Sequence, residues 1–390
     1  MLNFIFQNAT KIIFGRGTEN QVGKEVKDYS NKILFVSYGK GVIEKLGLYD
    51  RAITSLKTSG IEVIELRGVV ANGKLDLVYE GIRLCKENNI NFILAVGGGS
   101  VIDTAKSIAV GVPYQGDVWD FFAEKAIPEK VLPIGTILTI PASGSETSNA
   151  AVITRVDGSL KRAFKSELIR PKFSILNPEL LYTLPPYQIA CGVTDIMAHD
   201  MERYFSSVTH VDLTDRLCEA VFKSVMLHAP LVLKNPKNYD AWAEIMWGGT
   251  IAHNDLLTTG RVQDLASHDI EHELSGIYDV AHGAGLAVIF PAWMKYVYKN
   301  DIERFAQFAV RMMNVDYFFK DPELTVLEGI KKLEDFYVSI GMPIRLKGLG
   351  ITDDRFKEMA LKATYNGTRT LGNFVKLGHK DIYNIFKLAV

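Results

Sequence analysis

The sequence predicts an α/β domain with a parallel sheet followed by an all-helical domain, and three observations lead to this prediction. The chain has 390 residues, more than one hydrophobic core usually spans. Before residue 185, short apolar runs alternate with amphipathic stretches, the order that parallel β-α-β units require. After this point strand-like runs almost vanish, and apolar residues recur at helical spacing. We therefore expect domains at 1–184 and 185–390.

The elements of the first domain follow from its apolar runs and turn residues. Buried strands are expected at residues 32–36, 61–66, 91–96 and 138–140. Amphipathic helices are expected between them, at residues 42–58 and 74–89. Asp157 and Gly158 form a short-turn signal between the strand-like segments 153–156 and 162–164. These two segments should form a hairpin at the edge of the sheet.

The second domain begins after Leu184-Pro185-Pro186, where the sequence pattern changes. Its clearest helices are expected at residues 213–227, 302–313, 324–340 and 354–362. The chain shows neither an internal repeat nor a low-complexity segment.

Composition and charge argue against several classes of function. Lys and Arg number 44 against 45 Asp and Glu, a net charge of -1, so nothing indicates a nucleic-acid partner. Residues 1–11 do not resemble a secretory signal, and no apolar run approaches the ~18 residues of a membrane-spanning helix. The 3 cysteines lie far apart, which favours neither disulfides nor a Cys-x-x-Cys zinc site. We expect a cytoplasmic protein that binds neither nucleic acid nor membrane.

A glycine-rich turn, Gly97-Gly98-Gly99-Ser100, lies between a predicted strand and a predicted helix at 101–109. Glycines let the backbone approach a pyrophosphate closely, and the N–H groups and dipole of the following helix then hold its charge. The turn does not have the Gly-x-Gly-x-x-Gly spacing of common dinucleotide sites. A tight β-α turn without a ligand is the alternative interpretation.

A second cluster of small and hydroxyl residues, Thr139 to Ser148, follows the last predicted strand. Its hydroxyls and its flexible glycine, Gly144, could line a phosphate or a nicotinamide ring. A loop in which a hydroxyl caps a helix is the alternative interpretation.

The first predicted strand leads into Gly39-Lys40-Gly41. In dinucleotide-binding β-α-β folds, an acid near this point binds the ribose 2′-hydroxyl, whereas a basic residue suits a 2′-phosphate. Lys40 lies close to the strand end, and the first acid is Glu44. This pattern favours NADP(H) over NAD(H).

Histidines and one aspartate cluster in the second domain. Asp195 and His199 are four residues apart, as are His268 and His272, so each pair shares a helix face. His282 follows in a glycine-flanked segment. Each histidine taken alone has an ordinary structural explanation, and a carboxylate–imidazole pair at this spacing is a common helix contact. Their repetition indicates a site for Zn(II) or Fe(II), and spacing leaves open whether His268 or His272 is the ligand.

These segments together resemble the iron-containing (group III) alcohol dehydrogenase family, within it the butanol dehydrogenase and NADP-dependent aldehyde reductase branch. The matching segments are Gly97 to Ser100 with Asp103 and Lys106, Thr139 to Ser148, Asn177-Pro178, Asp195-x-x-x-His199, His268-x-x-x-His272 and His282-Gly283. They occur in the family's order and span nearly the whole chain. The resemblance implies a Rossmann-like parallel sheet and a helical domain, in a dehydroquinate synthase-like fold with a cleft between the domains.

The resemblance also implies roles for individual residues. The metal, Fe²⁺ with Zn²⁺ as the alternative, would be bound by Asp195, His199, His268 and His282. The nicotinamide cofactor would contact Gly39, Lys40, Gly41, Gly97, Gly98, Gly99, Ser100, Thr139 and Ser143. The candidate catalytic residues are His272, beside the nicotinamide and the substrate, and Asp103, near the reacting end. The branch further implies a homodimer.

We therefore expect a metal-dependent alcohol dehydrogenase or aldehyde reductase. It would transfer a hydride between NADP(H) and a short-chain primary alcohol or aldehyde such as butanol or butanal, with His272 delivering the proton. The nearest alternative is a zinc-dependent glycerol or other polyol dehydrogenase. A lyase resembling dehydroquinate synthase needs several basic residues near the metal, where only Arg261 stands. A metal-binding or interaction module without catalytic activity is a further alternative.

Overall fold

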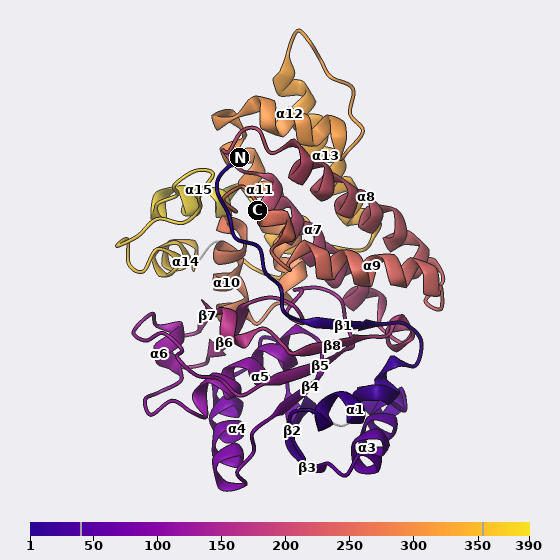
Figure 1. The fold of residues 1–390 in the computed structure, drawn as a ribbon. Coiled ribbons are helices and arrows are strands. Elements are labelled where there is room, and N and C mark those ends of the chain that lie inside the picture. The colour runs from indigo at the N-terminus through magenta and orange to yellow at the C-terminus, as the bar shows by residue number, and fades with distance from the viewer. Residues whose placement is uncertain (40, 353–354) are drawn as a thin grey trace. The chain divides into compact units, whose positions relative to one another are not determined.

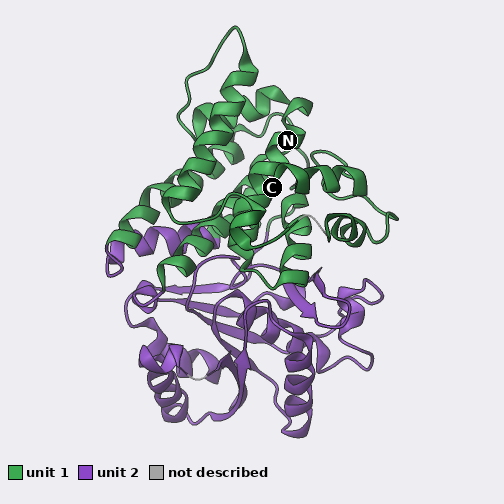
Figure 2. Ribbon diagram, turned by 180° about the vertical axis from the view of Figure 1, so that it is seen from behind, with its two compact units in different colours: residues 1–6, 185–234, 251–390 green, residues 7–184, 235–250 purple. Residues whose placement is uncertain are grey.

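The computed structural model describes residues 1–39, 41–352 and 355–390 and divides into two compact units (Figures 1 and 2). The sheet unit comprises residues 7–184 and 235–250, and the helical unit comprises residues 1–6, 185–234 and 251–390. The sheet unit holds a parallel sheet flanked by helices, whereas the helical unit is built of helices. The predicted fold class, an α/β domain followed by an all-α domain, is confirmed.

The sheet unit is built around six parallel strands, in the order β1-β8-β5-β4-β2-β3 within the described residues. They are β1 (Lys11–Phe14), β2 (Lys32–Tyr38), β3 (Glu62–Val69), β4 (Ile93–Gly97), β5 (Ile134–Leu138) and β8 (Phe173–Leu176). Ser37 of β2 lies opposite Val96 of β4, and Gly97 lies opposite Leu138 of β5. The carboxyl ends of three neighbouring strands thus meet at one edge, where parallel sheets commonly bind ligands.

Helices cover both faces of this sheet (Figure 1). The helices within residues 7–184 are α1 (Val22–Lys27), α2 (Val42–Lys45), α3 (Leu48–Thr58), α4 (Leu75–Glu87), α5 (Gly99–Gly111) and α6 (Trp119–Phe122). On one face, Leu56 of α3 packs in a core with Phe35 of β2. On the other face, a side chain at Gly81 of α4 would collide with Ile108, so α4 and α5 pack at close range. Since both faces are buried, β2 and β4 are apolar along most of their length.

The sheet unit departs from the prediction in its strand boundaries. The strand predicted at 138–140 is wrong, because β5 ends where that prediction begins. Pro141 has no N–H to donate and disfavours a regular continuation, so the chain turns into a loop after Leu138. The helix predicted at 42–58 is divided into α2 and α3 at Gly47, whose φ of 63° is left-handed. Strands β1 and β8 were not predicted.

The predicted hairpin forms, but not at the edge of the sheet. Its strands β6 (Ala150–Arg155) and β7 (Leu160–Lys165) pair antiparallel as a separate two-stranded sheet. The N–H of Val152 donates to Asp103 of α5 at 3.1 Å, and the carbonyl of Ala150 accepts from Lys106 at 2.9 Å. The edge location is therefore wrong, because polar side chains of α5 hold this hairpin.

The helical unit takes most of its residues from the part of the chain after residue 184. Its helices are α7 (Pro186–Tyr204), α8 (Asp212–Lys234), α10 (Ala266–Tyr278), α11 (His282–Val297), α12 (Ile302–Arg311), α13 (Pro322–Ser339), α14 (Phe356–Ala363) and α15 (His379–Leu388). Helix α9 (Tyr239–Ala252) runs from the sheet unit into the helical unit. The four predicted helices correspond to α8, α12, α13 and α14, although the predicted start at residue 354 lies outside the described residues. None of the described helices combines the length and apolar character needed to cross a membrane.

Candidate active site

Three helices of the helical unit bring the predicted metal ligands together. Asp195 and His199 lie one turn apart on α7, His268 lies in the first turn of α10, and His282 is the first residue of α11. Helices α7 and α11 approach closely because residue 283 is glycine. A side chain at Gly283 would collide with the α7 backbone. The glycine after His282, noted in the sequence as a flank, thus lets this histidine reach Asp195.

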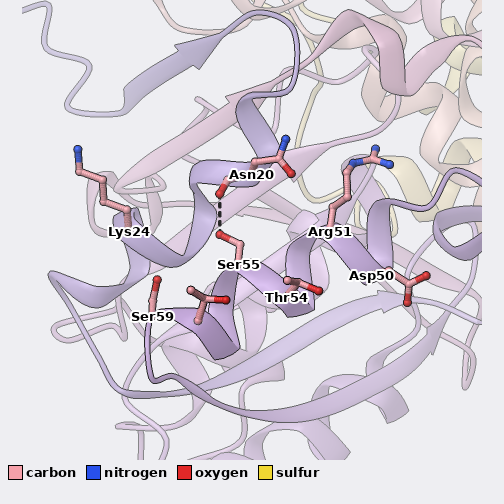
Figure 3. Close-up of a pocket in the computed structure, with 8 residues that line it drawn as sticks. Asn20, Lys24, Asp50, Arg51, Thr54, Ser55 and Ser59 are labelled. Carbon is pink, nitrogen blue, oxygen red and sulfur yellow. Dashed lines mark hydrogen bonds between the residues drawn. The ribbon is translucent and has the colours of Figure 1, made fainter.

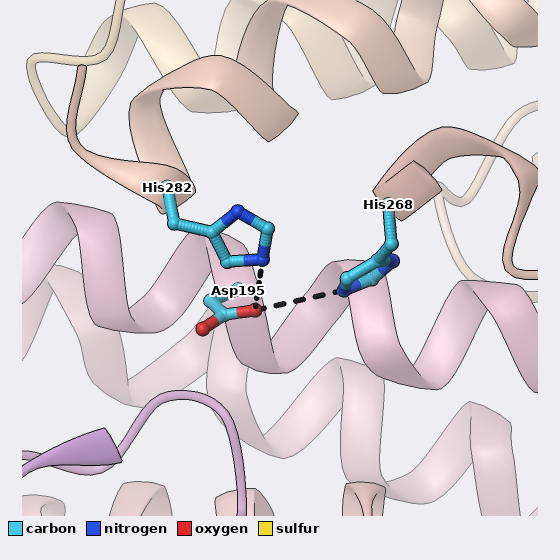
Figure 4. A group of neighbouring side chains, drawn as sticks. All are labelled: Asp195, His268 and His282. Atoms are coloured by element: carbon cyan, nitrogen blue, oxygen red, sulfur yellow. Dashed lines mark ion pairs between the residues drawn. The ribbon is translucent and has the colours of Figure 1, made fainter. Parts of the chain in front are cut away.

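The histidine side chains converge on one carboxylate oxygen. The Nε2 atoms of His199, His268 and His282 lie 3.3, 3.7 and 3.9 Å from Oδ1 of Asp195. Asp195, His268 and His282 offer ligand atoms within 4.8 Å of one another (Figure 4). His199 completes the group from the other side, where its ring packs on that of His268 with centroids 4.3 Å apart.

The donor atoms fit a divalent cation. Oδ1 of Asp195 and Nε2 of His268 are buried, and within the described residues neither has a hydrogen-bond partner. A buried polar atom without a partner is costly, and here one such atom is a carboxylate oxygen and the other an imidazole nitrogen, both of which can bind a cation. A cation between them would satisfy both. Imidazoles with one carboxylate are a donor set that Zn²⁺ and Fe²⁺ take in proteins.

Two buried glutamates hold the far sides of these histidine rings. Nδ1 of His268 lies 2.9 Å from Oε1 of Glu202, and Nδ1 of His282 is hydrogen bonded to Oε2 of Glu271. Both glutamates are completely buried. Such carboxylates fix the ring orientation and tautomer of a metal-binding histidine. Neither glutamate was predicted from the sequence, although Glu202 lies on α7 one turn beyond His199.

Two further residues, also missed in the sequence, pack on His199. The His253 ring stacks on it with centroids 4.1 Å apart. The guanidinium of buried Arg203, at the i+4 position, lies 3.2 Å from Nδ1 of His199 and donates to its carbonyl at 2.8 Å. The spacing of Arg203 was a usable signal, so the expectation that Arg261 is the only basic residue near these segments is wrong. His253, in contrast, lies far away in the sequence.

The surroundings shift the pKa values of two histidines in opposite directions. Burial, together with the charges of neighbouring His253 and His268, lowers the pKa of His199 well below its ordinary value. His199 is thus neutral, the form that binds metals. Burial alone would also lower the pKa of His268, but the neighbouring carboxylates of Asp195 and Glu202 raise it to about 9. A cation at this site would therefore compete with a proton on His268.

The geometry distinguishes His268 from His272, which spacing left open. His268 faces Asp195, whereas His272 is one turn further along α10, with its ring centroid 5.6 Å from that of His282. His272 is buried beside Glu271 and His282, and the three offer ligand atoms within 4.8 Å of one another. His272 therefore borders the cluster around Asp195 without facing Asp195 itself.

In the sheet unit, the glycine-rich turn is packed against neighbouring residues. Strand β4 ends at Gly97 and α5 begins at Gly99. A side chain at Gly98 would collide with Ile140, and one at Gly99 with the Ser143 hydroxyl. Glycine is thus required by close packing against the loop after β5. The N–H groups of Gly99 and Ser100 belong to the first turn of α5, where helical N–H groups have no intrahelical acceptor.

The loop after β5 is held by two buried residues of opposite charge on α5. Oδ1 of Asp103 accepts from the Ser145 hydroxyl at 2.5 Å, and Oδ2 accepts from the N–H of Val152 at 3.1 Å. The ammonium of Lys106, fully buried, donates to Ser145 at 3.0 Å and to the Ser148 carbonyl at 2.9 Å. Burial raises the pKa of Asp103, while it lowers that of Lys106 to about 8. Both oxygens of Asp103, a candidate catalytic residue, are therefore engaged in holding loop and hairpin.

The segment predicted to select the cofactor is described only in part. Lys40 lies outside the described residues. Gly41 has a φ of 134°, and its N–H donates to Oε2 of Glu44 at 2.8 Å. The other oxygen of Glu44 pairs with Arg67. The first acid after β2 is thus engaged with the protein itself. Gly39 is exposed, and a side chain there would meet open space.

A surface pocket lies elsewhere in the sheet unit, between α1 and α3 (Figure 3). Lys24, Arg51 and Ser55 are among its lining residues. Arg51 donates to Glu19 at 2.8 Å and to the Leu46 carbonyl at 3.0 Å, so its charge is already paired. None of the lining residues belongs to the predicted site.

Comparison with known proteins agrees with this architecture. Family models described as iron-containing alcohol dehydrogenase and as the C-terminal part of the Fe-containing alcohol dehydrogenase family match residues 9–178 and 189–390. The chain is 42% identical to the probable NADH-dependent butanol dehydrogenase 1 of Bacillus subtilis (strain 168), with 100% of both chains covered. It is 32% identical to the NADPH-dependent aldehyde reductase of Escherichia coli (strain K12), with 95% of each covered. The solved structure of NADH-dependent butanol dehydrogenase A from Thermotoga maritima matches with a TM-score of 0.96 and 38% identity, covering 100% of this chain and 99% of that one.

A parallel sheet with a glycine-rich turn, together with a helical unit that carries a histidine–aspartate cluster, is the architecture of a dehydrogenase that acts on alcohols. More particularly, the chain belongs to the iron-containing alcohol dehydrogenase family. It is therefore an NAD(P)-dependent alcohol dehydrogenase acting on small-molecule alcohols or aldehydes, and the family supports a divalent metal and a nicotinamide cofactor.

Proposed function

We propose that this enzyme is a metal-dependent aldehyde reductase and alcohol dehydrogenase for short-chain substrates such as butanal and butanol. The ligands of its metal, Fe²⁺ with Zn²⁺ as the alternative, are Asp195, His199, His268 and His282. The observation that carries the proposal is the convergence of three Nε2 atoms on Oδ1 of Asp195 at 3.3–3.9 Å. The names of the Bacillus and Thermotoga relatives support butanol as the substrate.

The chemistry divides between the metal and the chain's own residues. When bound, the metal supplies a Lewis acid that stabilises negative charge on the substrate oxygen as hydride is transferred. The free N–H groups of Gly99 and Ser100, at the positive end of α5, bind the cofactor pyrophosphate. Thr139 and Ser143 line the cofactor site, and Lys106 with Asp103 holds their loop in place.

His272 is proposed to hold the proton that the substrate oxygen takes up. An imidazole suits proton transfer near neutral pH. Its position one turn from His268 keeps it close to the reacting centre. We expect His272→Ala to lower kcat and to remove an inflection from the pH–rate profile, with metal content unchanged. Near-normal turnover across the pH range would contradict this role.

The nicotinamide donor is proposed to be NADH. The Bacillus and Thermotoga relatives are both named as NADH-dependent. The sequence analysis favoured NADPH because of Lys40, and the Escherichia coli relative, at lower identity, is named as NADPH-dependent. A larger kcat/KM for NADH than for NADPH would support the proposal. The opposite ratio, reversed by Lys40→Ala, would restore the interpretation of Lys40 as a 2′-phosphate contact.

The first experiment is an initial-rate assay with butanal on anaerobically prepared protein, before and after chelation and addition of Fe²⁺ or Zn²⁺. Metal-restored oxidation of NAD(P)H would support the proposal. Activity with glycerol but not butanol would indicate a polyol dehydrogenase, and no net cofactor oxidation despite bound metal would indicate a lyase. We also propose that the enzyme is a cytoplasmic homodimer, which light scattering and cell fractionation test.

A further inference from the structure

We propose that Glu271 is a positioning residue for metal binding, which orients His282 so that its Nε2 atom faces Asp195. Glu271 lies on α10 directly before His272, and His282 begins α11. The inference rests on the proposed function, because it takes His282 as a metal ligand.

The hydrogen bonds of Glu271 determine the state of the His282 ring. Oε2 of Glu271 bonds to Nδ1 of His282, and Oε1 accepts from the Ser275 hydroxyl. A carboxylate accepts but does not donate, so the proton of the neutral imidazole must stay on Nδ1. The lone pair is then on Nε2, which lies 3.9 Å from Oδ1 of Asp195. The bond thus selects the tautomer that can bind a cation on the side of Asp195.

The same geometry argues against Glu271 as a metal ligand in its own right. The two nitrogens of an imidazole ring point in different directions. Glu271 takes the Nδ1 side of His282, whereas Asp195 faces the Nε2 side. Glu271 therefore lies behind the ring that it orients.

The packing around Glu271 leaves room for this carboxylate and for little else. Glu271 is completely buried, and a side chain at Gly285 on α11 would collide with its Oε1 atom. His282 needs such an anchor more than His268 does. Its side chain is 22% exposed against 7% for His268, so surrounding atoms constrain it less. Glycine at position 285 thus leaves the space that the Glu271 carboxylate occupies.

The test measures metal affinity of the apo protein rather than activity. Zn²⁺ affinity is obtained by chelator competition, and the Co²⁺-substituted protein reports ligand geometry through its visible absorption bands. We expect Glu271→Ala to weaken Zn²⁺ binding by about 10- to 100-fold at unchanged stoichiometry. Glu271→Gln, which keeps an acceptor oxygen for Nδ1–H, should recover much of this loss. Gly285→Ala keeps the carboxylate but displaces it, so it should weaken binding as well and serves if Glu271→Ala fails to fold.

The matched control is Glu273→Gln, which removes another buried carboxylate from α10, one near Lys362 at 3.5 Å. It should leave Zn²⁺ affinity within about twofold of wild type. Wild-type affinity in both Glu271→Ala and Gly285→Ala would overturn the inference while leaving the metal site intact. If Glu271→Gln binds one metal ion fewer per chain than wild type, Glu271 is itself a metal ligand and the inference is wrong. A wild-type protein that binds no Zn²⁺ or Fe²⁺ would instead overturn the proposed function itself.

Discussion

The hydroxyl oxygen of Tyr38 accepts the backbone N–H of Gly98 at 3.1 Å, at the turn where β4 passes into α5. Tyr38 ends β2, the strand beside β4, so this bond ties the ends of two neighbouring strands together. The N–H of Gly98 is thereby already satisfied. Under the proposed function, we therefore expect the cofactor phosphate to be bound by the N–H groups of Gly99 and Ser100 in the first turn of α5.

Tyr38→Phe tests this arrangement. The substitution leaves the N–H of Gly98 without its acceptor, so we expect the free energy of unfolding to fall by about 1–2 kcal/mol. The loosened turn should raise the KM for the nicotinamide cofactor severalfold, with little change in kcat at saturation. Urea denaturation and steady-state kinetics measure the two effects. A lower KM would show that Gly98 binds the cofactor directly once released from Tyr38.

Lys106→Met tests the two buried residues of opposite charge on α5. The ammonium neutralises Asp103 and bonds to the loop after β5 as well as to the Ala150 carbonyl. Its loss would leave the buried carboxylate with only the weaker influence of the Lys161 charge, which we expect to cost about 3–5 kcal/mol of unfolding free energy. The control is Lys57→Met, at an exposed position of α3. Its free energy of unfolding should stay within about 0.5 kcal/mol of wild type. Similar stability of the two variants would contradict a structural role for Lys106.

The parts of the fold that could be predicted are those written in local patterns. Strands β2 and β4 are buried on both faces and therefore appear as continuous apolar runs. Strands β1 and β8 are four residues each. Their pairing joins Lys11 to Phe173, which are separated by most of the sequence of the sheet unit. No local pattern encodes such a partner, so neither strand was predicted.

In the candidate site, too, the residues that a local pattern brings together could be predicted, and the residues that only packing brings together could not. Asp195 and His199 stand out because one helical turn separates them. Glu202 reaches His268 across 66 residues of sequence, and Glu271 is adjacent in sequence to His272 but binds His282. Only the packing of α7, α10 and α11 creates these contacts. A buried glutamate on a helix has no sequence signature that separates it from an exposed one.

Asp264 should make stability depend on pH. Burial, reinforced by the charge of Glu202, raises the pKa of Asp264 to about 7, although the N–H groups of Asn373 and Phe374 donate to it at 2.5 and 2.6 Å. Between about pH 4 and pH 7, Asp264 then holds a proton in the folded state, whereas in the unfolded chain its pKa is about 4 and the proton has been released. Its contribution to unfolding free energy is therefore present below about pH 4 and lost as pH rises to about 7.

Asp264→Asn is the variant that isolates this effect. The amide does not titrate, so the stability of the variant relative to wild type should increase between pH 4 and pH 7, by up to about 4 kcal/mol. Urea denaturation at several pH values measures the difference, in which other titrating groups cancel. A difference that does not change with pH would show that Asp264 titrates alike in the folded and unfolded protein.

The paired variants His199→Ala and His253→Phe separate a metal ligand from its neighbour. The two rings stack with centroids 4.1 Å apart, and Nε2 of His199 lies 3.3 Å from Oδ1 of Asp195. Removing a metal ligand should weaken metal binding more than removing a residue that only contacts a ligand. His199→Ala should therefore weaken Zn²⁺ binding by more than about 100-fold. Phe at position 253 keeps a ring against His199, so its metal affinity should change by less than about tenfold. The reverse order would mean that the cation is held by His253, and that the carboxylate of Asp195 is approached by a different set of imidazoles.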